Sequence, residues 1–120
     1  HLAYVTVGTG IGAGVVQNGS IANGRSHPEI GHIRVQRHPS DRTFSGTCPL
    51  HGDCLEGLAS GPAIAARWGA TLTELSQDHP GLVLEGFYLG QLAMNLVLHH
   101  RPVCILINRF CRIPLWINSN

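Results

Sequence analysis

Two cysteines and a histidine, each separated from the next by two residues, make the short segment 48–54 a candidate metal-binding loop. The residues are Cys48, His51 and Cys54. Cysteine thiolates and histidine nitrogens are the ligands that zinc prefers, and this spacing lets one short loop wrap around a single ion. The segment therefore predicts three of the four ligands of a zinc site.

A closed tetrahedral site needs a fourth ligand, and we expect His32 to supply it, with His27 and His38 as alternatives. The competing interpretation of the loop is a disulfide between its two cysteines, or two unpaired thiols. We favour a metal because no stretch of the sequence reads as a secretory signal. The two other cysteines, Cys104 and Cys111, also lie far along the chain.

Glycine alternates with other residues over the segment 8–14, which reads Gly-Thr-Gly-Ile-Gly-Ala-Gly. Four glycines let backbone N–H groups converge on an anion without obstruction by Cβ atoms, and Thr9 can add a hydroxyl donor. The segment is not a P-loop, because no Gly-Lys-Ser/Thr follows, and it fits a dinucleotide fingerprint poorly, because a strand is expected after it. It is either a phosphate-binding turn or a glycine-rich hairpin without a ligand.

Two glutamates lie close to the candidate metal ligands in the sequence. Glu29 belongs to the segment 27–32, His-Pro-Glu-Ile-Gly-His, and Glu56 lies two residues after Cys54. An ionised carboxylate accepts hydrogen bonds from two or more hydroxyl groups, so both glutamates could hold a sugar. The alternatives are a solvated turn residue for Glu29 and, for Glu56, a first-turn residue that the helix dipole favours.

Strand and helix patterns alternate along the chain and must position these residues. Strands are predicted over residues 2–7, over the residues that end at Asn18-Gly19, over 32–37 and over 103–107. A loop is expected over 38–53, and helices are expected from Cys54, from Ser60-Gly61-Pro62 to Gly69, and over 82–100. Strands followed by helices and a further strand favour an α/β or α+β domain.

The composition is that of a small folded domain with few charges. The chain has 120 residues, of which 43% are hydrophobic and 12% charged, and its formal net charge is +1. No basic run is present, so the electrostatics give little support to a nucleic-acid partner. The longest apolar region, 82–98, is interrupted by Glu85 and by other polar and glycine residues, which argues against a membrane span of about 20 residues. We therefore expect no nucleic-acid partner and no association with a membrane, and we expect a cytoplasmic location.

Taken in order, these motifs resemble the ROK family of sugar kinases (repressor, ORF, kinase). The resemblance rests on the segments 5–12, 27–32, 48–56 and 58–63 and covers about four-fifths of the chain. The Cys-x-x-His-x-x-Cys-x-Glu loop is similar to that of the bacterial fructokinase branch. The run Arg37-His38-Pro39-Ser40-Asp41, together with Phe44 and Gly46, points to the same branch.

The resemblance implies an actin-like, ribonuclease H-like fold of two lobes, with ATP and Mg²⁺ bound between them. The zinc would be structural, because it fixes the loop that presents the sugar ligands. The residues that the resemblance implies are the sugar ligands Glu29, His32 and Glu56, the nucleotide neighbours Thr9, Gly10 and Pro62, and the zinc ligands His32, Cys48, His51 and Cys54.

The activity that the resemblance implies is ATP-dependent phosphorylation of a hexose, with fructose converted to fructose 6-phosphate as the first expectation. Glucose, mannose and N-acetylhexosamine kinases are the near alternatives. A sugar-responsive transcription repressor of the same family is the alternative of a different class, and it would need a helix-turn-helix domain upstream. The family also suggests a homodimer.

The sequence departs from the family pattern at both ends. The family's Asp-Gly-Gly-Thr phosphate motif and its catalytic Asn-Asp pair precede the region that this chain covers, so we expect no catalytic residue and no kinase turnover here. A Gly-Gly-Gly turn should follow the strand at 103–107, but residues 107–112 read Ile-Asn-Arg-Phe-Cys-Arg. We therefore expect a partial kinase domain over 1–107 and a tail unlike the family over 108–120, and we hypothesise a frameshift near residues 98–108.

Overall fold

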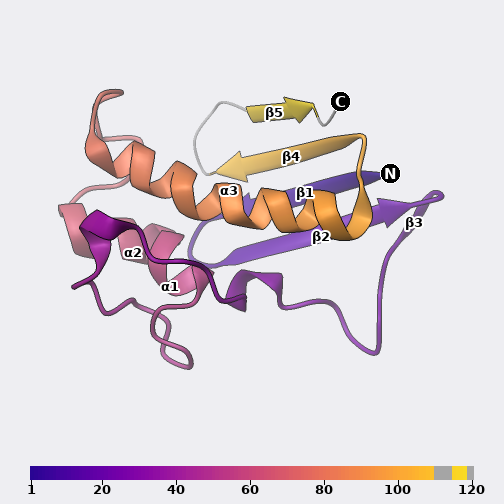
Figure 1. Ribbon diagram of the computed structural model, residues 1–120, viewed down its shortest axis with the longest axis horizontal. Helices are drawn as coiled ribbons and strands as arrows, with labels where there is room; N and C mark the ends of the chain where they lie inside the picture. Colours follow the sequence, from indigo (N-terminus) through magenta and orange to yellow (C-terminus); the bar gives the residue numbers. More distant parts are fainter. Residues whose placement is uncertain (110–114, 119–120) are drawn as a thin grey trace.

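The computed structural model describes residues 1–109 and 115–118 and contains a five-stranded sheet with helices packed against one face (Figure 1). The strand order is β3-β2-β1-β4-β5. The central strand β1 is antiparallel to β2 and parallel to β4. The strands are β1 (Leu2–Val7), β2 (Ile11–Gln17), β3 (Ser20–Ile21), β4 (Cys104–Arg109) and β5 (Leu115–Asn118).

The first hairpin confirms the predicted strand, glycine turn and strand. Along β1, Ala3, Val5 and Val7 are buried and alternate with less buried residues, as expected for a strand with one face on the core. The turn after β2 has positive φ at both Asn18 (51°) and Gly19 (78°). A tight two-residue hairpin turn requires this backbone conformation, which Asn-Gly favours.

Three helices follow the long loop: α1 (Leu55–Ala59), α2 (Gly61–Trp68) and α3 (Pro80–His100). The predicted restart at residue 60 is confirmed, because the Ser60 side chain caps α2 by accepting a hydrogen bond from the Ala63 N–H. The helix ends at Gly69, which has φ 66°, as predicted for a glycine stop.

Helix α3 crosses one face of the sheet, with α1 and α2 near its first half (Figure 1). It is long and apolar enough to cross a membrane by length and composition alone, but 44% of that apolar window is buried inside the fold. The buried side chains of α3 that join those of β1, β4 and α1 in one core are Leu84, Tyr88, Leu89, Leu92, Ala93 and Leu96. The apolar stripe of this helix is therefore explained by core packing.

The strand predicted over 32–37 is wrong. A 3₁₀ turn, η1 (Ile30–His32), is followed by an extended segment that pairs with no strand among the described residues. Its backbone groups have other partners: the Ile33 carbonyl accepts from the Leu55 N–H at 2.9 Å, and the Gln36 N–H donates to the side chain of Gln91 at 2.7 Å. The segment is thus attached to α1 and α3 instead of to a sheet edge.

The C-terminal residues are described only in part. The structure places 108 and 109 in β4, and β5 is antiparallel to β4. The sequence had predicted no strand over 115–118. Residues 110–114 and 119–120 lie outside the described residues, so the expected tail over 108–120 and the frameshift hypothesis rest in part on residues that the structure does not describe.

Candidate functional site

The four predicted metal ligands come together in one cluster, in front of the start of α1. The ligand atoms of His32, Cys48, His51 and Cys54 all lie within 4.8 Å of one another. His32 belongs to η1, and the other three belong to the loop that precedes α1. Residues separated by 16 in the sequence, such as His32 and Cys48, therefore meet in one cluster.

The spacing of these atoms suits a tetrahedral ion. The Nδ1 atom of His32 lies 3.7 Å from the sulfur of Cys48, 3.4 Å from the sulfur of Cys54 and 3.2 Å from Nδ1 of His51. With Zn–S bonds of about 2.3 Å and Zn–N bonds of about 2.0–2.1 Å, tetrahedral geometry requires S···N distances of about 3.6 Å and N···N distances of about 3.4 Å. The three distances at His32 are close to these values, and two cysteine sulfurs with two imidazole nitrogens are a donor set that zinc binds.

Close contacts between glycines and backbone hold the loop in this shape. The Cys48 N–H donates to the Gly52 carbonyl at 3.2 Å, and the Gly52 N–H donates back at 2.8 Å. A Cβ atom at Gly46 would lie 2.0 Å from the Gly52 oxygen, and one at Gly57 would lie 1.8 Å from it. Any side chain at those two positions would push the loop open, so glycine is required there.

The two thiols of the cluster are free and differ in acidity. Both Cys48 and Cys54 are unpaired, so the disulfide alternative is not formed in the structure. Burial acts to raise the pKa of Cys48, but hydrogen bonds from the backbone of His51 and Leu50 and from the Cys54 and His51 side chains outweigh it and lower the pKa to about 6. Burial and the neighbouring Cys48 raise the pKa of Cys54.

The alternative fourth ligands have other partners. The Nε2 atom of His27 lies 2.8 Å from the Glu29 carboxylate on an exposed loop. The Nδ1 atom of His38 accepts the Ser40 N–H at 3.1 Å and so caps the 3₁₀ turn η2 (Pro39–Asp41). Neither histidine belongs to the cluster, whereas His32 does.

Glu56 lies between the cluster and the glycine-rich hairpin. Its Oε1 atom accepts the backbone N–H of Ile11 at 2.9 Å, and its Oε2 atom lies 3.7 Å from Nε2 of His32. A Cβ atom at Gly10 would lie 2.6 Å from the same Oε1 atom, so glycine is needed where the hairpin approaches this carboxylate. Glu56 is also in the first turn of α1, where the helix dipole favours a negative charge.

The predicted sugar ligands are brought together only in part. His32 and Glu56 are neighbours, but among the described residues the Glu29 carboxylate pairs with His27 alone. The main chain still connects the two regions, because the Glu29 carbonyl accepts the His32 N–H at 3.0 Å. Glu29 also lines a hollow of about 200 Å³ with Thr6 and Gly12, beside the strands β1 and β2.

Two of the three predicted nucleotide neighbours line one pocket. Thr9 and Pro62 face a cavity of about 420 Å³ between the glycine-rich turn, α2 and the residues that follow it, 71–73. The Gly61 N–H donates to the Gly8 carbonyl at 2.7 Å and thereby fixes the start of α2 against the turn. Gly10 does not line this cavity and faces Glu56 instead.

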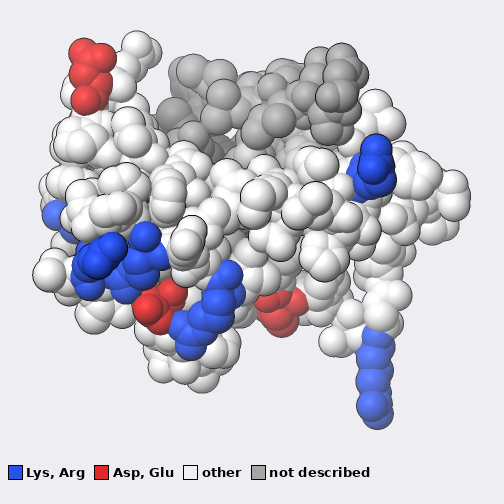
Figure 2. All heavy atoms as spheres, in the orientation of Figure 1, with Lys and Arg blue, Asp and Glu red and all other residues white. Residues whose placement is uncertain are grey.

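Charged residues around the loop were missed by the sequence reasoning. Asp53 binds Arg34 at 2.5 Å and Arg37 at 3.3 Å. Burial acts to raise the pKa of Asp53, but the hydrogen bonds and charge of Arg34 and the hydrogen bond of Arg37 lower it. In Figure 2, arginine and acidic side chains gather along the lower edge of this face, beneath α3. No local pattern pairs residues that are 16 and 19 positions apart, so only the fold reveals these contacts.

A second charged network connects the loop to two helices. The Asp41 carboxylate accepts two hydrogen bonds of 2.9 Å from Arg67 on α2 and one of 2.6 Å from the Tyr88 hydroxyl on α3. The carboxylate and the guanidinium are almost fully buried. Burial and the Asp41 carboxylate raise the pKa of Tyr88. Arg67 also lies 4.1 Å from the centre of the Phe44 ring.

Comparison with known proteins gives one consistent result. The model of the ROK family matches residues 1–107. The chain is 46% identical to the fructokinase of Lactococcus lactis subsp. cremoris over 107 residues, which are 89% of this chain and 37% of that protein. It is 48% identical to the fructokinase of Zymomonas mobilis over 95 residues, 78% of this chain and 32% of that protein. It thus spans about a third of the length of these curated relatives.

Among solved structures, the fold is similar to that of the ROK hexokinase from Thermus thermophilus. The TM-score is 0.65 at 23% sequence identity, over 90% of this chain and 40% of that chain. This similarity concerns the fold alone, because the sequence identity is low. The mixed α/β arrangement of the sheet and helices is therefore shared with a ROK kinase.

Proposed function

The chain belongs to the ROK family, and from this membership we propose that it forms the zinc-binding and sugar-binding part of a fructokinase. The reaction is transfer of the γ-phosphoryl group of ATP to a hexose, with fructose converted to fructose 6-phosphate. The similarity to two fructokinases, at 46% and 48% identity, supports fructose over other hexoses. The observation that carries the proposal is the four-ligand cluster with Glu56 beside it.

The proposed zinc ion has a structural role. Two cysteines and two histidines fill all four positions of a tetrahedral site, which leaves no open position for a substrate. Such an ion would stabilise the loop 48–54 and orient the His32 ring, without taking part in phosphoryl transfer. The distances among the ligand atoms, between 3.2 and 3.7 Å where His32 takes part, support this assignment.

The proposed sugar ligands are Glu56, His32 and Glu29. With Nδ1 of His32 directed at the cluster, its Nε2 atom is on the other side of the ring, where Glu56 lies. A hydroxyl group bound there could donate to the carboxylate and interact with the ring nitrogen. The role of Glu29 as a sugar ligand is implied by the family resemblance. The hydrogen bond from the His32 N–H to the Glu29 carbonyl supports a position of Glu29 near the same site.

The proposed nucleotide site is the cavity lined by Thr9 and Pro62, with Gly10 at the turn beside it. Bound ATP would bring Mg²⁺, which offsets the charge that develops as the phosphoryl group moves. A sugar hydroxyl would attack the γ-phosphorus and form a new P–O bond. The bond between the γ-phosphorus and the β,γ-bridging oxygen would break, ADP would leave, and a carboxylate would take the hydroxyl proton. We assign that carboxylate to no residue of this chain.

We further propose a cytoplasmic location and a homodimer, as the family resemblance suggests.

A chimaera tests the function directly. Residues 1–107, which the family model matches, would replace the corresponding segment of the Lactococcus lactis fructokinase, to which this chain is 46% identical over 107 residues. We expect the chimaera to phosphorylate fructose with ATP and to need a higher fructose concentration for this activity after Glu56→Gln. A folded, zinc-loaded chimaera that phosphorylates another hexose better than fructose, or none, would contradict the proposal.

A further inference from the structure

An acidic residue lies between two of the cluster's ligands and is held by two arginines. Asp53 follows His51 by two residues and directly precedes Cys54. Its Oδ1 atom accepts from Arg34 at 2.5 Å and its Oδ2 atom accepts from Arg37 at 3.3 Å. Both carboxylate oxygens therefore have a cationic partner outside the loop.

We propose that Asp53 is a positioning residue for the zinc loop, and that Arg34 and Arg37 hold it there. This inference rests on the zinc site proposed above. A site of two thiolates, two neutral imidazoles and one Zn²⁺ ion carries no net charge, so the ion itself gives the two arginines no anionic partner. Asp53 supplies that partner and thereby attaches the loop to the segment after His32.

Arg34 contacts the loop at two points. Besides the Asp53 carboxylate, its Nη1 atom donates to the main-chain carbonyl of His51 at 3.4 Å. Arg34 lies two residues after His32, so this arginine joins the extended segment that directly follows one ligand to the loop that carries the other three. Its contacts oppose movement of the loop away from His32.

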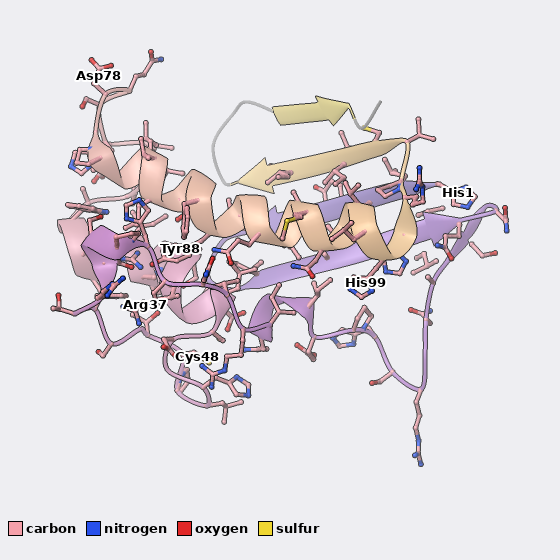
Figure 3. The ribbon with its side chains drawn as sticks, viewed as in Figure 1. His1, Arg37, Cys48, Asp78, Tyr88 and His99 are labelled. Atoms are coloured by element: carbon pink, nitrogen blue, oxygen red, sulfur yellow. The ribbon has the colours of Figure 1, made fainter. Side chains whose placement is uncertain are left out.

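Arg37 connects Asp53 to the interior. Its Nη2 atom donates to the main-chain carbonyls of Asp41 and Phe44, and its side chain is only 22% exposed. Asp41 in turn is fixed by the buried contacts with Arg67 and Tyr88. Figure 3 shows Arg37, Cys48 and Tyr88 on the same side of α3. Through Arg37 the loop is thus connected to a buried network, in addition to its contacts with the exposed Arg34.

The expected effect is moderate. The Arg34 and Asp53 side chains are 65% and 42% exposed, and exposed ion pairs contribute little. Partners that orient metal ligands, however, change metal affinity by roughly 10- to 100-fold when they are lost. Because Asp53 acts on the main chain of the loop and not on a ligand atom, we expect Zn²⁺ loss to accelerate by roughly 3- to 10-fold.

The test compares four forms of the full chain: wild type, Asp53→Asn, Arg34→Gln and the control Asp78→Asn. Asp78 is exposed and lies far from Cys48 (Figure 3). The rate of Zn²⁺ transfer to a coloured chelator is measured for each, and bound Co²⁺ reports the geometry through its visible absorption. We expect faster transfer and an altered Co²⁺ spectrum in Asp53→Asn, faster transfer in Arg34→Gln, and wild-type behaviour in Asp78→Asn.

Thermal unfolding in the presence of chelator separates positioning from general stability. A positioning role predicts that metal-free Asp53→Asn unfolds at the wild-type temperature. It also predicts that the double variant with Arg34→Gln loses zinc more slowly than the product of the two single effects, because both variants remove the same ion pair and only the Arg34 contact with the His51 carbonyl is additional. Wild-type transfer rates in Asp53→Asn would overturn this inference while the zinc site stands. A wild-type chain that binds no zinc would overturn both.

Discussion

The Oε2 atom of Glu56 lies 3.7 Å from Nε2 of His32, on the side of the ring opposite the nitrogen that faces both cysteines. The other oxygen of the same carboxylate accepts the Ile11 N–H. One side chain therefore contacts both the His32 ring of the cysteine–histidine cluster and the glycine-rich hairpin. Its substitution should affect sugar binding without removing a metal ligand.

Replacing Glu56 by glutamine keeps the size of the side chain and removes its charge. Hydrogen bonds to charged groups contribute about 1.5–3 kcal/mol, which corresponds to roughly a 10- to 100-fold change in affinity. We expect the fructose KM of the chimaera to rise by at least about 10-fold while its zinc content stays the same. An unchanged KM would show that Glu56 does not bind the sugar.

Replacing Gly10 by alanine tests the approach of the hairpin to Glu56. The new Cβ would lie 2.6 Å from Oε1, so the carboxylate must move. We expect a several-fold higher fructose KM. The free energy of unfolding should fall by only about 1 kcal/mol or less, because the carboxylate is the far end of a flexible side chain and can move aside. Gly14→Ala is the matched control, since nothing lies within 4 Å of its added Cβ. Equal KM values for the two variants would contradict this account.

Removing the Tyr88 hydroxyl tests the buried network around Asp41. Tyr88→Phe deletes the 2.6 Å bond to Asp41 and leaves the His38 N–H without its 3.2 Å acceptor. We expect chemical denaturation of the zinc-loaded chain to show a loss of about 1–3 kcal/mol. Tyr4→Phe is the control, because the Tyr4 hydroxyl accepts from Asn108 at an exposed position. A loss no larger than that of the control would contradict a stabilising role.

The low pKa of Cys48 makes the stability of the metal-free chain depend on pH. The fold lowers this pKa from 9.0 to about 6, so between these values the unfolded chain binds more protons than the folded chain. The unfolding free energy should therefore rise with pH across that window, and the contribution of Cys48 should be lost as the pH falls through about 6.

Thiolate absorbance in the ultraviolet measures this titration in the metal-free chain. We expect a first transition with a midpoint near pH 6, and its absence in Cys48→Ser. Cys54 should titrate later, because its pKa is raised. A single thiol transition close to the ordinary cysteine value of about 8.5 would show that the hydrogen bonds to Cys48 do not form in solution.

Local chemistry predicted most of the elements and the membership of the cluster. The Asn18-Gly19 turn, the Ser60 cap and the Gly69 stop follow from backbone preferences of single residues, and all are present. The Cys-x-x-His-x-x-Cys spacing identified three members of the cluster because they belong to one loop. His32 needed an inference across the chain, and the structure places it with them.

The features that the sequence missed depend on tertiary contacts. The alternation over 32–37 is equally compatible with a strand and with an extended segment attached to α1 and α3, because both leave every second side chain on one face. The pairing of Asp53 with Arg34, and of Asp41 with Arg67, joins residues 19 and 26 positions apart. The orientation of Glu29 toward His27 likewise depends on how the loop lies in space.

The metal content of the purified chain tests the central claim most directly. Elemental analysis should find about one Zn²⁺ ion per wild-type chain and per Cys104→Ser chain, and almost none in Cys48→Ser, because a structural site needs all four ligands. Cys104 is the matched control because it lies on β4, outside the cluster. A wild-type chain without zinc, or a Cys48→Ser chain that keeps it, would contradict a zinc ion bound by His32, Cys48, His51 and Cys54.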